Sequence, residues 1–257
     1  MTRTTPTVLV IAGLDPSGGA GLVADIQTLS ALGVHPAVAA TTLTVQDTRN
    51  AYEVRPLDAE FVVAQARAVL ADMPVAAVKL GLLGSAATGE AVAALLNETP
   101  DIPVVLDPVL VASGGAKLAE DALVDTMRNR LLPRATLATP NRREFLRLAG
   151  QGNDDAERAA ELLARGCPNL LVTGGDDDTD TVRNTLYSAA AAQQYEWPRL
   201  DGPFHGSGCT LAAAAAASLA HGMSVPDAVK TAQDFTFNAL NTAQRIGRGQ
   251  PIPNRMP

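Results

Sequence analysis

Short apolar runs alternate along the chain with longer stretches in which apolar residues recur every three or four positions. A continuous apolar run is typical of a buried parallel strand, and the wider spacing is typical of a helix. The pattern predicts strands at 7–12, 36–44, 76–80, 103–106, 135–139 and 169–173. It predicts helices at 22–32, 58–71, 87–97, 120–131, 142–148, 154–165 and 225–243, and an alanine-rich helix that follows Cys209.

Beyond the sixth strand the alternation changes. Residues 176–180 predict a polar turn, residues 182–197 an antiparallel hairpin, and the Gly- and Pro-rich tail after Arg245 an irregular segment. Strands that alternate with helices form a mostly parallel sheet with helices on both faces. We therefore expect an α/β fold in which residues 1–257 form one domain.

The charge, the length of the apolar runs and the positions of the cysteines limit the binding partners and sites that this chain can have. The net charge is −7 and no basic run is present, which argues against nucleic acid or an anionic membrane as partner. No segment has the ~20 apolar residues that a membrane span needs. Cys167 and Cys209 lie far apart and indicate neither a disulfide framework nor a zinc site. The cytoplasm is the expected compartment.

Glycine or polar residues follow four of the predicted strands. They are 13–15, 46–47, 107–108 and 139–141, and a fifth loop, 205–210, precedes the alanine-rich helix. Ligands of open α/β sheets bind at the carboxyl ends of the strands. The sequence therefore predicts that these five segments form one site.

The first glycine cluster occupies residues 13–21, between a strand and a helix. Glycines there let backbone amides approach a ligand closely. The cluster lacks the Gly-Lys-Ser/Thr of a Walker A loop and the spacing of a dinucleotide fingerprint. A plain flexible turn is the alternative.

The second cluster, 205–210, starts a helix with small residues. Free amides and the helix dipole would form an anion hole there, which suits charge on a transferring phosphoryl group. The same dipole is expected to lower the pKa of the Cys209 thiol, which could then accept a proton from a substrate hydroxyl or position it. The alternative is that Cys209 merely fits the helix start.

Three further polar positions carry weaker signals. Asn141 and Glu144, three residues apart, could order a Mg²⁺ shell, or could form an N-terminal capping box. Asp107 could lie near phosphate and metal, or could form a turn. The amide of Gln46 could bind a heteroaromatic ring, because it both donates and accepts.

Several motifs together resemble the hydroxymethylpyrimidine/phosphomethylpyrimidine kinases of thiamine biosynthesis. The likeness runs from about Val8 to Leu240 with the motifs in the same order. The opening segment, VLVIAGLDPSGGAGLVADIQTLSALGV, and the loop HGSGCT are the most specific. Supporting motifs are TVQDT at 44–48, VKLGLL at 78–83, LDPVLVA at 106–112, LLP at 131–133 and TPNRRE at 139–144.

This resemblance implies a ribokinase-like three-layer α/β/α sandwich with a mostly parallel central sheet, usually as a homodimer. It implies transfer of the ATP γ-phosphate, with Mg²⁺, to the hydroxymethyl group of 4-amino-5-hydroxymethyl-2-methylpyrimidine, and typically a second transfer to the resulting monophosphate. The pyrimidine would be bound by Gln46, Gly13, Asp25, Val45, Leu82 and Val109.

The resemblance also implies roles at the other end of the site. Cys209 would be the catalytic residue, with Gly206 and Gly208 in the anion hole. The nucleotide would be bound by Asp107, Asn141, Thr173, Gly175 and Ser207, and Mg²⁺ by Glu144 and Asp107.

The chain departs from the family at several positions near phosphates. Thr173-Gly-Gly-Asp176 stands where Lys-Gly-Gly-His is frequent, Gln233 stands where Lys is common, and residues 201–204 replace a usual Thr-Lys-Asn-Thr. Fewer cations should weaken handling of a phosphorylated substrate. We therefore expect an impaired second phosphorylation, unless a basic residue such as Lys117 or Arg183 compensates.

Three other functions stay open at this point. Pyridoxal also offers a hydroxymethyl group on a six-membered heteroaromatic ring, so pyridoxal kinase of vitamin B6 salvage is a rival. A weakly catalytic pyrimidine-binding sensor would keep the same fold. A hydride-transfer enzyme is disfavoured because the glycine spacing is wrong.

Overall fold

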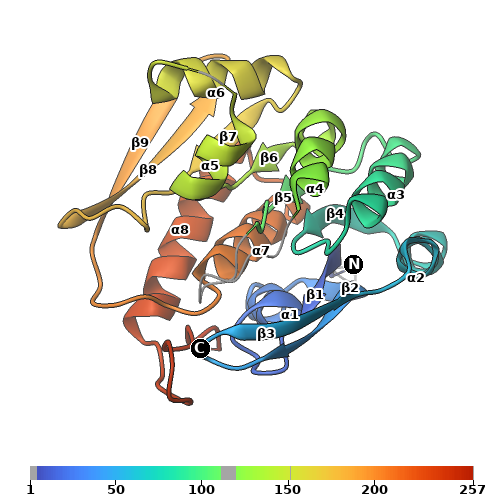
Figure 1. Ribbon diagram of the computed structural model, residues 1–257, viewed down its shortest axis with the longest axis horizontal. Helices are drawn as coiled ribbons and strands as arrows, with labels where there is room; N and C mark the ends of the chain where they lie inside the picture. The colour runs from blue at the N-terminus through green and yellow to red at the C-terminus, as the bar shows by residue number, and fades with distance from the viewer. Residues whose placement is uncertain (1–4, 111–119, 151, 257) are drawn as a thin grey trace.

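One nine-stranded sheet runs through the described residues, which are 5–110, 120–150 and 152–256 of the computed structural model (Figure 1). The strand order is β3-β2-β1-β4-β5-β6-β7-β8-β9. The strands are β1 (Thr7–Leu14), β2 (His35–Gln46), β3 (Ala51–Pro56), β4 (Val75–Leu80), β5 (Val104–Leu106), β6 (Leu137–Ala138), β7 (Asn169–Val172), β8 (Thr181–Ser188) and β9 (Ala192–Pro198).

The six central strands are parallel and the flanking strands are antiparallel. Parallel pairing joins β2, β1, β4, β5, β6 and β7, whereas β3, β8 and β9 pair antiparallel with their neighbours. This arrangement confirms the mostly parallel sheet and the hairpin expected at 182–197. The sequence pattern missed β3, because this edge strand is largely exposed and alternates charged with apolar residues instead of presenting an apolar run.

Helices cover both faces of the sheet. They are α1 (Gly21–Ala31), α2 (Ala59–Asp72), α3 (Ala86–Asn97), α4 (Asp121–Thr126), α5 (Arg142–Leu148), α6 (Asp155–Ala164), α7 (Ser207–Ala220) and α8 (Val225–Asn241). The expected helix at 120–131 is α4 continued by a π-helical turn, Met127–Leu131, and a short 3-10 turn, Leu132–Arg134, follows.

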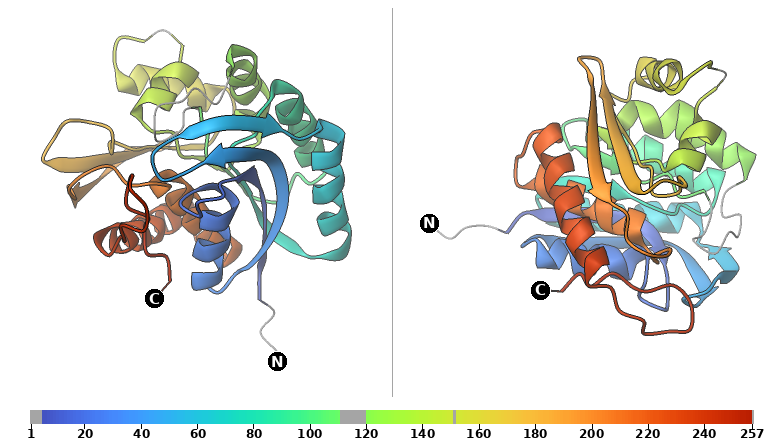
Figure 2. Two further views of the ribbon diagram at one scale, coloured as in Figure 1. Left: turned by 60° about the horizontal axis from the view of Figure 1, so that its bottom comes forward. Right: turned by 90° about the vertical axis from the view of Figure 1, so that its left-hand side faces the viewer.

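Alternate side chains of β1 divide the core into two layers. Leu9 and Ile11 pack with residues of α2 to α6 on one face, and Val8 and Val10 pack with α1, α7 and α8 on the other. Figures 1 and 2 show the same division of the helices between the two faces. The three-layer α/β/α architecture is thus confirmed.

The chain beyond α8 is irregular, as its composition predicted, but specific contacts hold it in place. Gln244 and Ile252 form an antiparallel bridge, and Arg255 is buried. Within the described ranges, no helix combines the length and hydrophobicity needed to span a bilayer. Cys167 and Cys209 are both free thiols.

Candidate active site

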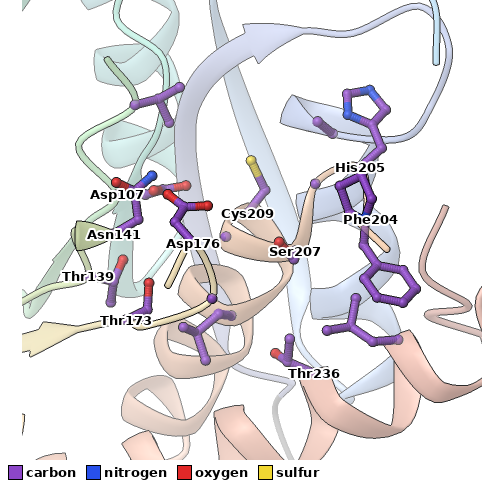
Figure 3. Close-up of a pocket in the computed structure, with 18 of the residues that line it drawn as sticks. Asp107, Thr139, Asn141, Thr173, Asp176, Phe204, His205, Ser207, Cys209 and Thr236 are labelled. Atoms are coloured by element: carbon purple, nitrogen blue, oxygen red, sulfur yellow. The ribbon is translucent and has the colours of Figure 1, made fainter. Parts of the chain in front are cut away.

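A cavity of about 470 Å³ lies at the carboxyl ends of the parallel strands. All five predicted segments contribute to its wall, and Figure 3 labels residues of three of them, namely Asp107, Thr139, Asn141, His205, Ser207 and Cys209. The expected site residues that line it are Gly13, Gln46, Leu82, Asp107, Val109, Asn141, Glu144, Thr173, Gly175, Gly206, Ser207, Gly208 and Cys209. The fold therefore brings together residues that are up to 196 positions apart in the chain, from Gly13 to Cys209.

Two of the expected pyrimidine-binding residues lie elsewhere. Asp25 is fully buried in α1 and does not line the cavity, because its carboxylate faces Lys79 in the sheet. Val45 is 55% exposed and also lies outside the cavity wall, because its side chain alternates with that of Gln46 along β2. Neither side chain contacts the cavity as the resemblance implied.

The first glycine loop is a folded structure and not a flexible turn. Asp15 accepts hydrogen bonds from the amides of Ser17 and Ala20, both at 2.8 Å. Gly21 has φ +57°, and a Cβ there would lie 2.3 Å from the Gly13 carbonyl oxygen. The loop thus needs glycine at this close approach.

His205 joins this loop to the second strand, although the sequence pattern gave it no role. Its Nε2 lies 2.8 Å from Asp15 Oδ2 and 3.2 Å from Gln46 Nε2. Burial alone would raise the pKa of Asp15, but hydrogen bonds from His205 and Ser17 hold it below its usual range. Because the Nε2 proton goes to Asp15, the same nitrogen cannot also accept from Gln46, and the Gln46 amide lies at one end of the cavity close to His205 and an ionised carboxylate.

The second glycine loop starts α7 with free amides. Gly206 is the N-cap, with φ +74°, and no side chain caps the helix. A Cβ at Gly206 would lie 2.0 Å from the Gly19 carbonyl oxygen, so the two glycine loops are in contact. The uncapped amides of the first turn and the helix dipole leave a positive helix end at the cavity.

Cys209 lies in the first turn of α7, between the two ends of the cavity (Figure 3). The expectation of a lowered thiol pKa was wrong. Burial raises the pKa of Cys209 to about 12, and the carboxylates of Asp107 and Asp25 add to this although Lys79 opposes it. Desolvation and the two nearby anions outweigh the cation of Lys79 and disfavour the thiolate.

A buried charge cluster that the sequence analysis missed reaches the cavity wall through Lys79 and Asp107. Lys79, fully buried in β4, lies 3.0 Å from Asp25 and 3.7 Å from Asp107. Although burial alone would lower the pKa of Lys79, the two aspartates and Cys209 raise it, so it remains a cation. A single Lys inside an apolar strand was the available signal, because a buried ammonium requires a partner.

Asn141 and Glu144 form the capping box of α5. Asn141 Oδ1 accepts the Glu144 amide at 2.9 Å, and Glu144 Oε2 accepts the Asn141 amide at 3.0 Å. Burial, with the charge of Asp107, raises the pKa of Glu144 to about 8. Burial also raises the pKa of Asp107, whose Oδ2 has no hydrogen-bond partner among the described residues. This end of the cavity therefore concentrates carboxyl groups that favour a cation.

An aromatic pair lies further along the cavity wall. Trp197 of β9 and Phe237 of α8 have ring centroids 5.2 Å apart, and both line the cavity. Gln233 accepts hydrogen bonds from Trp197 Nε1 at 3.1 Å and from Asn184 Nδ2 at 2.8 Å. The cavity wall thus includes two aromatic rings, of which Trp197 is held by Gln233.

Sequence comparison places the chain in a known family. The model of the family described as phosphomethylpyrimidine kinase matches residues 15–254. The chain belongs to the phosphomethylpyrimidine kinase family. A hydroxymethylpyrimidine/phosphomethylpyrimidine kinase from Streptomyces coelicolor is 42% identical over 96% of this chain and 93% of the relative. The expected family and the expected kinase class are confirmed.

Solved structures show the same fold. The ADP complex of Bacillus subtilis pyridoxal kinase has a TM-score of 0.89 and 30% identity, and the match covers 98% of both chains. The phosphomethylpyrimidine kinase from Clostridium difficile has a TM-score of 0.79 and 28% identity, and covers 91% of this chain and 98% of the other. These likenesses confirm the ribokinase-like fold.

Proposed function

We propose that the chain transfers the γ-phosphoryl group of ATP to the hydroxymethyl group of 4-amino-5-hydroxymethyl-2-methylpyrimidine, in thiamine biosynthesis. One observation carries this proposal: the Gln46–His205 pair, the free amides of α7 and the carboxyl groups at Asp107 and Glu144 line a single cavity, with Cys209 between them. The Gln46 region thus suits a ring with polar edges, the start of α7 suits an anion, and the carboxyl groups of Asp107 and Glu144 suit a cation.

The pyrimidine belongs at the Gln46 end in this proposal. The Gln46 amide can both donate to and accept from a heteroaromatic ring. Gly13 lines the cavity at a position that needs glycine, because a Cβ there would lie 2.3 Å from Thr42 Oγ1 and 3.0 Å from Leu82. Leu82 and Val109 line the same cavity as apolar contacts.

Charge that develops on the transferring phosphoryl group would be stabilised by the start of α7. Its amides at Ser207, Gly208 and Cys209 have no intrahelical partner, and preorganised donors of this kind are the main contribution of protein to phosphoryl transfer. Gly208 has open space toward Asp107, 3.9 Å from where a Cβ would lie. Glycine keeps that space for the ligand.

ATP and Mg²⁺ belong at the Asp107 end. Asp107 Oδ2 is buried without a hydrogen bond, although Lys79 Nζ lies 3.7 Å away, and the Asp107 charge raises the pKa of Glu144, so a divalent cation would relieve both groups. Asn141 and Glu144 Oε2 are used in the capping box, Glu144 Oε1 accepts the Leu110 amide at 3.3 Å, and no group of three metal-ligating side chains exists among the described residues. This suits Mg²⁺, which is usually held by one or two carboxylates, water and substrate phosphates. Bound there, Mg²⁺ would neutralise phosphate charge.

Adenine fits the aromatic end of the cavity, where Trp197 and Phe237 form an apolar wall. Thr173 forms a backbone bridge with Asn141, the N-cap of α5, and both Thr173 and Gly175 line the cavity. Arg143, exposed at the rim, makes no hydrogen bond or ion pair with another described residue. It is available to nucleotide phosphates.

Cys209 positions the substrate hydroxyl in this proposal and does not act as a thiolate base. Its thiol pKa of about 12 is too high for an appreciable thiolate population at physiological pH. The sulfur nevertheless lies between the ring end and the phosphate end, where a reacting hydroxyl must lie (Figure 3).

The second phosphorylation is proposed to be the weaker step. Thr173 and Gln233 both line the cavity, and Gln233 is held by Asn184 and Trp197, so neither brings a cation. Arg183, suggested as a compensating cation, pairs with Glu196 at 2.9 Å and does not line this cavity. The other suggestion, Lys117, lies outside the described residues.

Pyridoxal is the second candidate substrate. The likeness to Bacillus subtilis pyridoxal kinase, with a TM-score of 0.89 over nearly the whole chain, favours it. The likeness in sequence to the Streptomyces coelicolor hydroxymethylpyrimidine/phosphomethylpyrimidine kinase is greater, at 42% against 30%. We therefore propose the pyrimidine as the main substrate and pyridoxal as a lesser one.

The wider assignment is also a proposal: one ribokinase-like domain over residues 1–257, acting in the cytoplasm as a homodimer. The single sheet supports the one domain. Exposed apolar residues on β2 and β3, namely Val38, Leu43, Val45 and Tyr52, offer a surface for a second copy. Light scattering of the purified protein tests the dimer, and a monomer at every concentration would contradict it.

The purified protein with Mg-ATP tests the main proposal. Hydroxymethylpyrimidine, its monophosphate and pyridoxal are offered separately at matched concentrations, and products are resolved by chromatography. We expect fast conversion of hydroxymethylpyrimidine, slow conversion of its monophosphate and a gain in the second rate in Thr173→Lys. Conversion of pyridoxal alone would favour the second candidate, and binding without turnover by folded protein would favour a sensor.

A further inference from the structure

The segment after α8 turns back across the site. Gln244 and Ile252 exchange two backbone hydrogen bonds of 2.9 Å, which close a loop. Within that loop the Gln250 amide donates to Thr48 O at 2.8 Å, and the Pro251 carbonyl accepts the His205 amide at 2.9 Å. In Figure 2 this segment, in dark red, turns from the end of α8 towards α1. It therefore lies against the turn after β2 and against the second glycine loop.

Arg255, near the end of this segment, is only 2% exposed. Its guanidinium donates to Gly19 O at 2.5 Å and to Gly18 O at 3.4 Å in the first glycine loop. It also donates to Thr210 Oγ1 at 2.9 Å in α7 and to Gln27 Oε1 at 3.2 Å in α1. One side chain thus joins the two glycine loops that line the cavity.

The spacing between those loops is tight at this contact. A Cβ at Gly206 would lie 2.0 Å from Gly19 O and 2.9 Å from the Arg255 guanidinium. Because the Gly206 peptide starts α7, a shift of the first glycine loop would be transmitted to the free amides of the helix. Preorganised donors lose much of their effect when they are displaced.

The acceptors of Arg255 are all neutral. They are two carbonyls, one amide oxygen and one hydroxyl, and no carboxylate of the described residues lies within ion-pair distance of this guanidinium. A buried guanidinium stays charged, since arginine does not lose its proton in proteins. Its positive charge, which the nearby carboxylates of Asp25 and Asp15 offset only from beyond ion-pair distance, lies behind the start of α7, where it adds to the helix dipole.

We infer that Arg255 is a positioning residue for phosphoryl transfer, which holds the first glycine loop against the start of α7 and supplies positive charge behind the anion hole. The inference rests on the proposed kinase function. It concerns the step in which phosphate charge develops, so its loss should lower kcat more than it raises the KM for the pyrimidine.

Three variants of Arg255 distinguish the effect of its charge from the effect of its hydrogen-bond geometry and from a contribution to folding alone. Arg255→Met removes both the charge and the hydrogen bonds. Arg255→Lys keeps the charge but loses the planar guanidinium that donates several hydrogen bonds at once. Arg255→Ala opens space for added guanidinium ions. Arg248→Met is the matched control, because Arg248 lies exposed in the same segment and does not line the cavity. Circular dichroism and thermal melting establish that each variant is folded at the assay temperature.

We expect kcat to fall about 10-fold or more in Arg255→Met, with the pyrimidine KM changed by less than about 3-fold. Arg255→Lys should retain part of the rate, and guanidinium should restore Arg255→Ala in a saturable manner without raising its melting temperature to the wild-type value. Wild-type kcat in folded Arg255→Met would overturn the inference. So would equal losses in the Met and Lys variants without rescue, which would leave Arg255 a structural role only. An inactive wild type would instead overturn the proposed function.

Discussion

The two ends of the cavity differ in how their charges are balanced. At the ring end, Asp15 is held by His205 and by two backbone amides, and its pKa lies below the usual range despite burial. At the opposite end, which we propose for ATP and Mg²⁺, burial raises the pKa of both Asp107 and Glu144. Asp107 keeps an oxygen without a hydrogen bond. The carboxylate at the first end has its hydrogen bonds made, whereas burial disfavours the charged forms of both carboxyl groups at the second.

The largest expected effect comes from the nucleotide end. Asp107→Asn removes the buried carboxylate that we assign to Mg-ATP, and should lower kcat/KM about 10- to 100-fold while raising the Mg²⁺ concentration needed for half-maximal rate. Magnesium titrations of initial rate measure this. Asp101→Asn, at a surface position, is the control. An unchanged magnesium dependence in Asp107→Asn would contradict a role of Asp107 in magnesium binding.

The next largest effect is expected at Gln46, at the end of the cavity that we propose for the pyrimidine ring. Gln46→Ala should raise the KM for the pyrimidine about 10-fold, because a buried hydrogen bond to the ring is lost, while the KM for ATP stays unchanged. Steady-state kinetics with each substrate varied in turn measure both constants. Gln193→Ala, on the exposed β9, should change neither constant. Equal changes in the two KM values would contradict a ring-specific role.

Cys209, between the two ends, should show a smaller effect. Cys209→Ser keeps a neutral group of similar size, so kcat should fall less than about 10-fold, below the roughly 100-fold or more that loss of a general base costs. The pH profile of kcat should keep its shape. Cys167→Ala, which removes the other thiol, serves as control. An inflection present only in the wild type would show that the thiol titrates during turnover.

The smallest effect concerns stability without ligand. Glu144 has a pKa of about 8 in the folded state against an ordinary value of 4.5, so the folded state binds a proton that the unfolded chain releases in this window. Its contribution to stability is complete below 4.5 and is lost as the pH rises through about 8. Glu144→Gln should therefore flatten the decline of melting temperature between these pH values. Melting curves across this range check it, and parallel declines in both proteins would refute it.

Local pattern was sufficient for the elements that build the ring end. Continuous apolar runs marked β1 and most of β2, and glycine and polar residues marked the loops at their ends. The topology of a parallel sheet then brought these ends together, as alternation of strands and helices predicts. The family resemblance rested on the same segments.

Electrostatic outcomes could not be predicted in this way. The helix dipole alone predicted a lowered pKa for Cys209, but the pKa is raised because burial and the carboxylates of Asp25 and Asp107 act on the same sulfur. Those groups come from α1 and the end of β5 and meet only in the folded chain. Desolvation depends on the atoms that surround a group, which a linear pattern does not contain.

The sequence by itself determined the fold class, the succession of central strands and helices along the chain, the two glycine loops and the family. Only the tertiary structure decided that His205 joins Asp15 to Gln46, that Lys79 lies between two aspartates, and that Arg255 links the glycine loops. The physical reason is range: strand and helix patterns arise from neighbours a few residues apart, whereas buried charges and hydrogen bonds are set by partners up to 237 positions away.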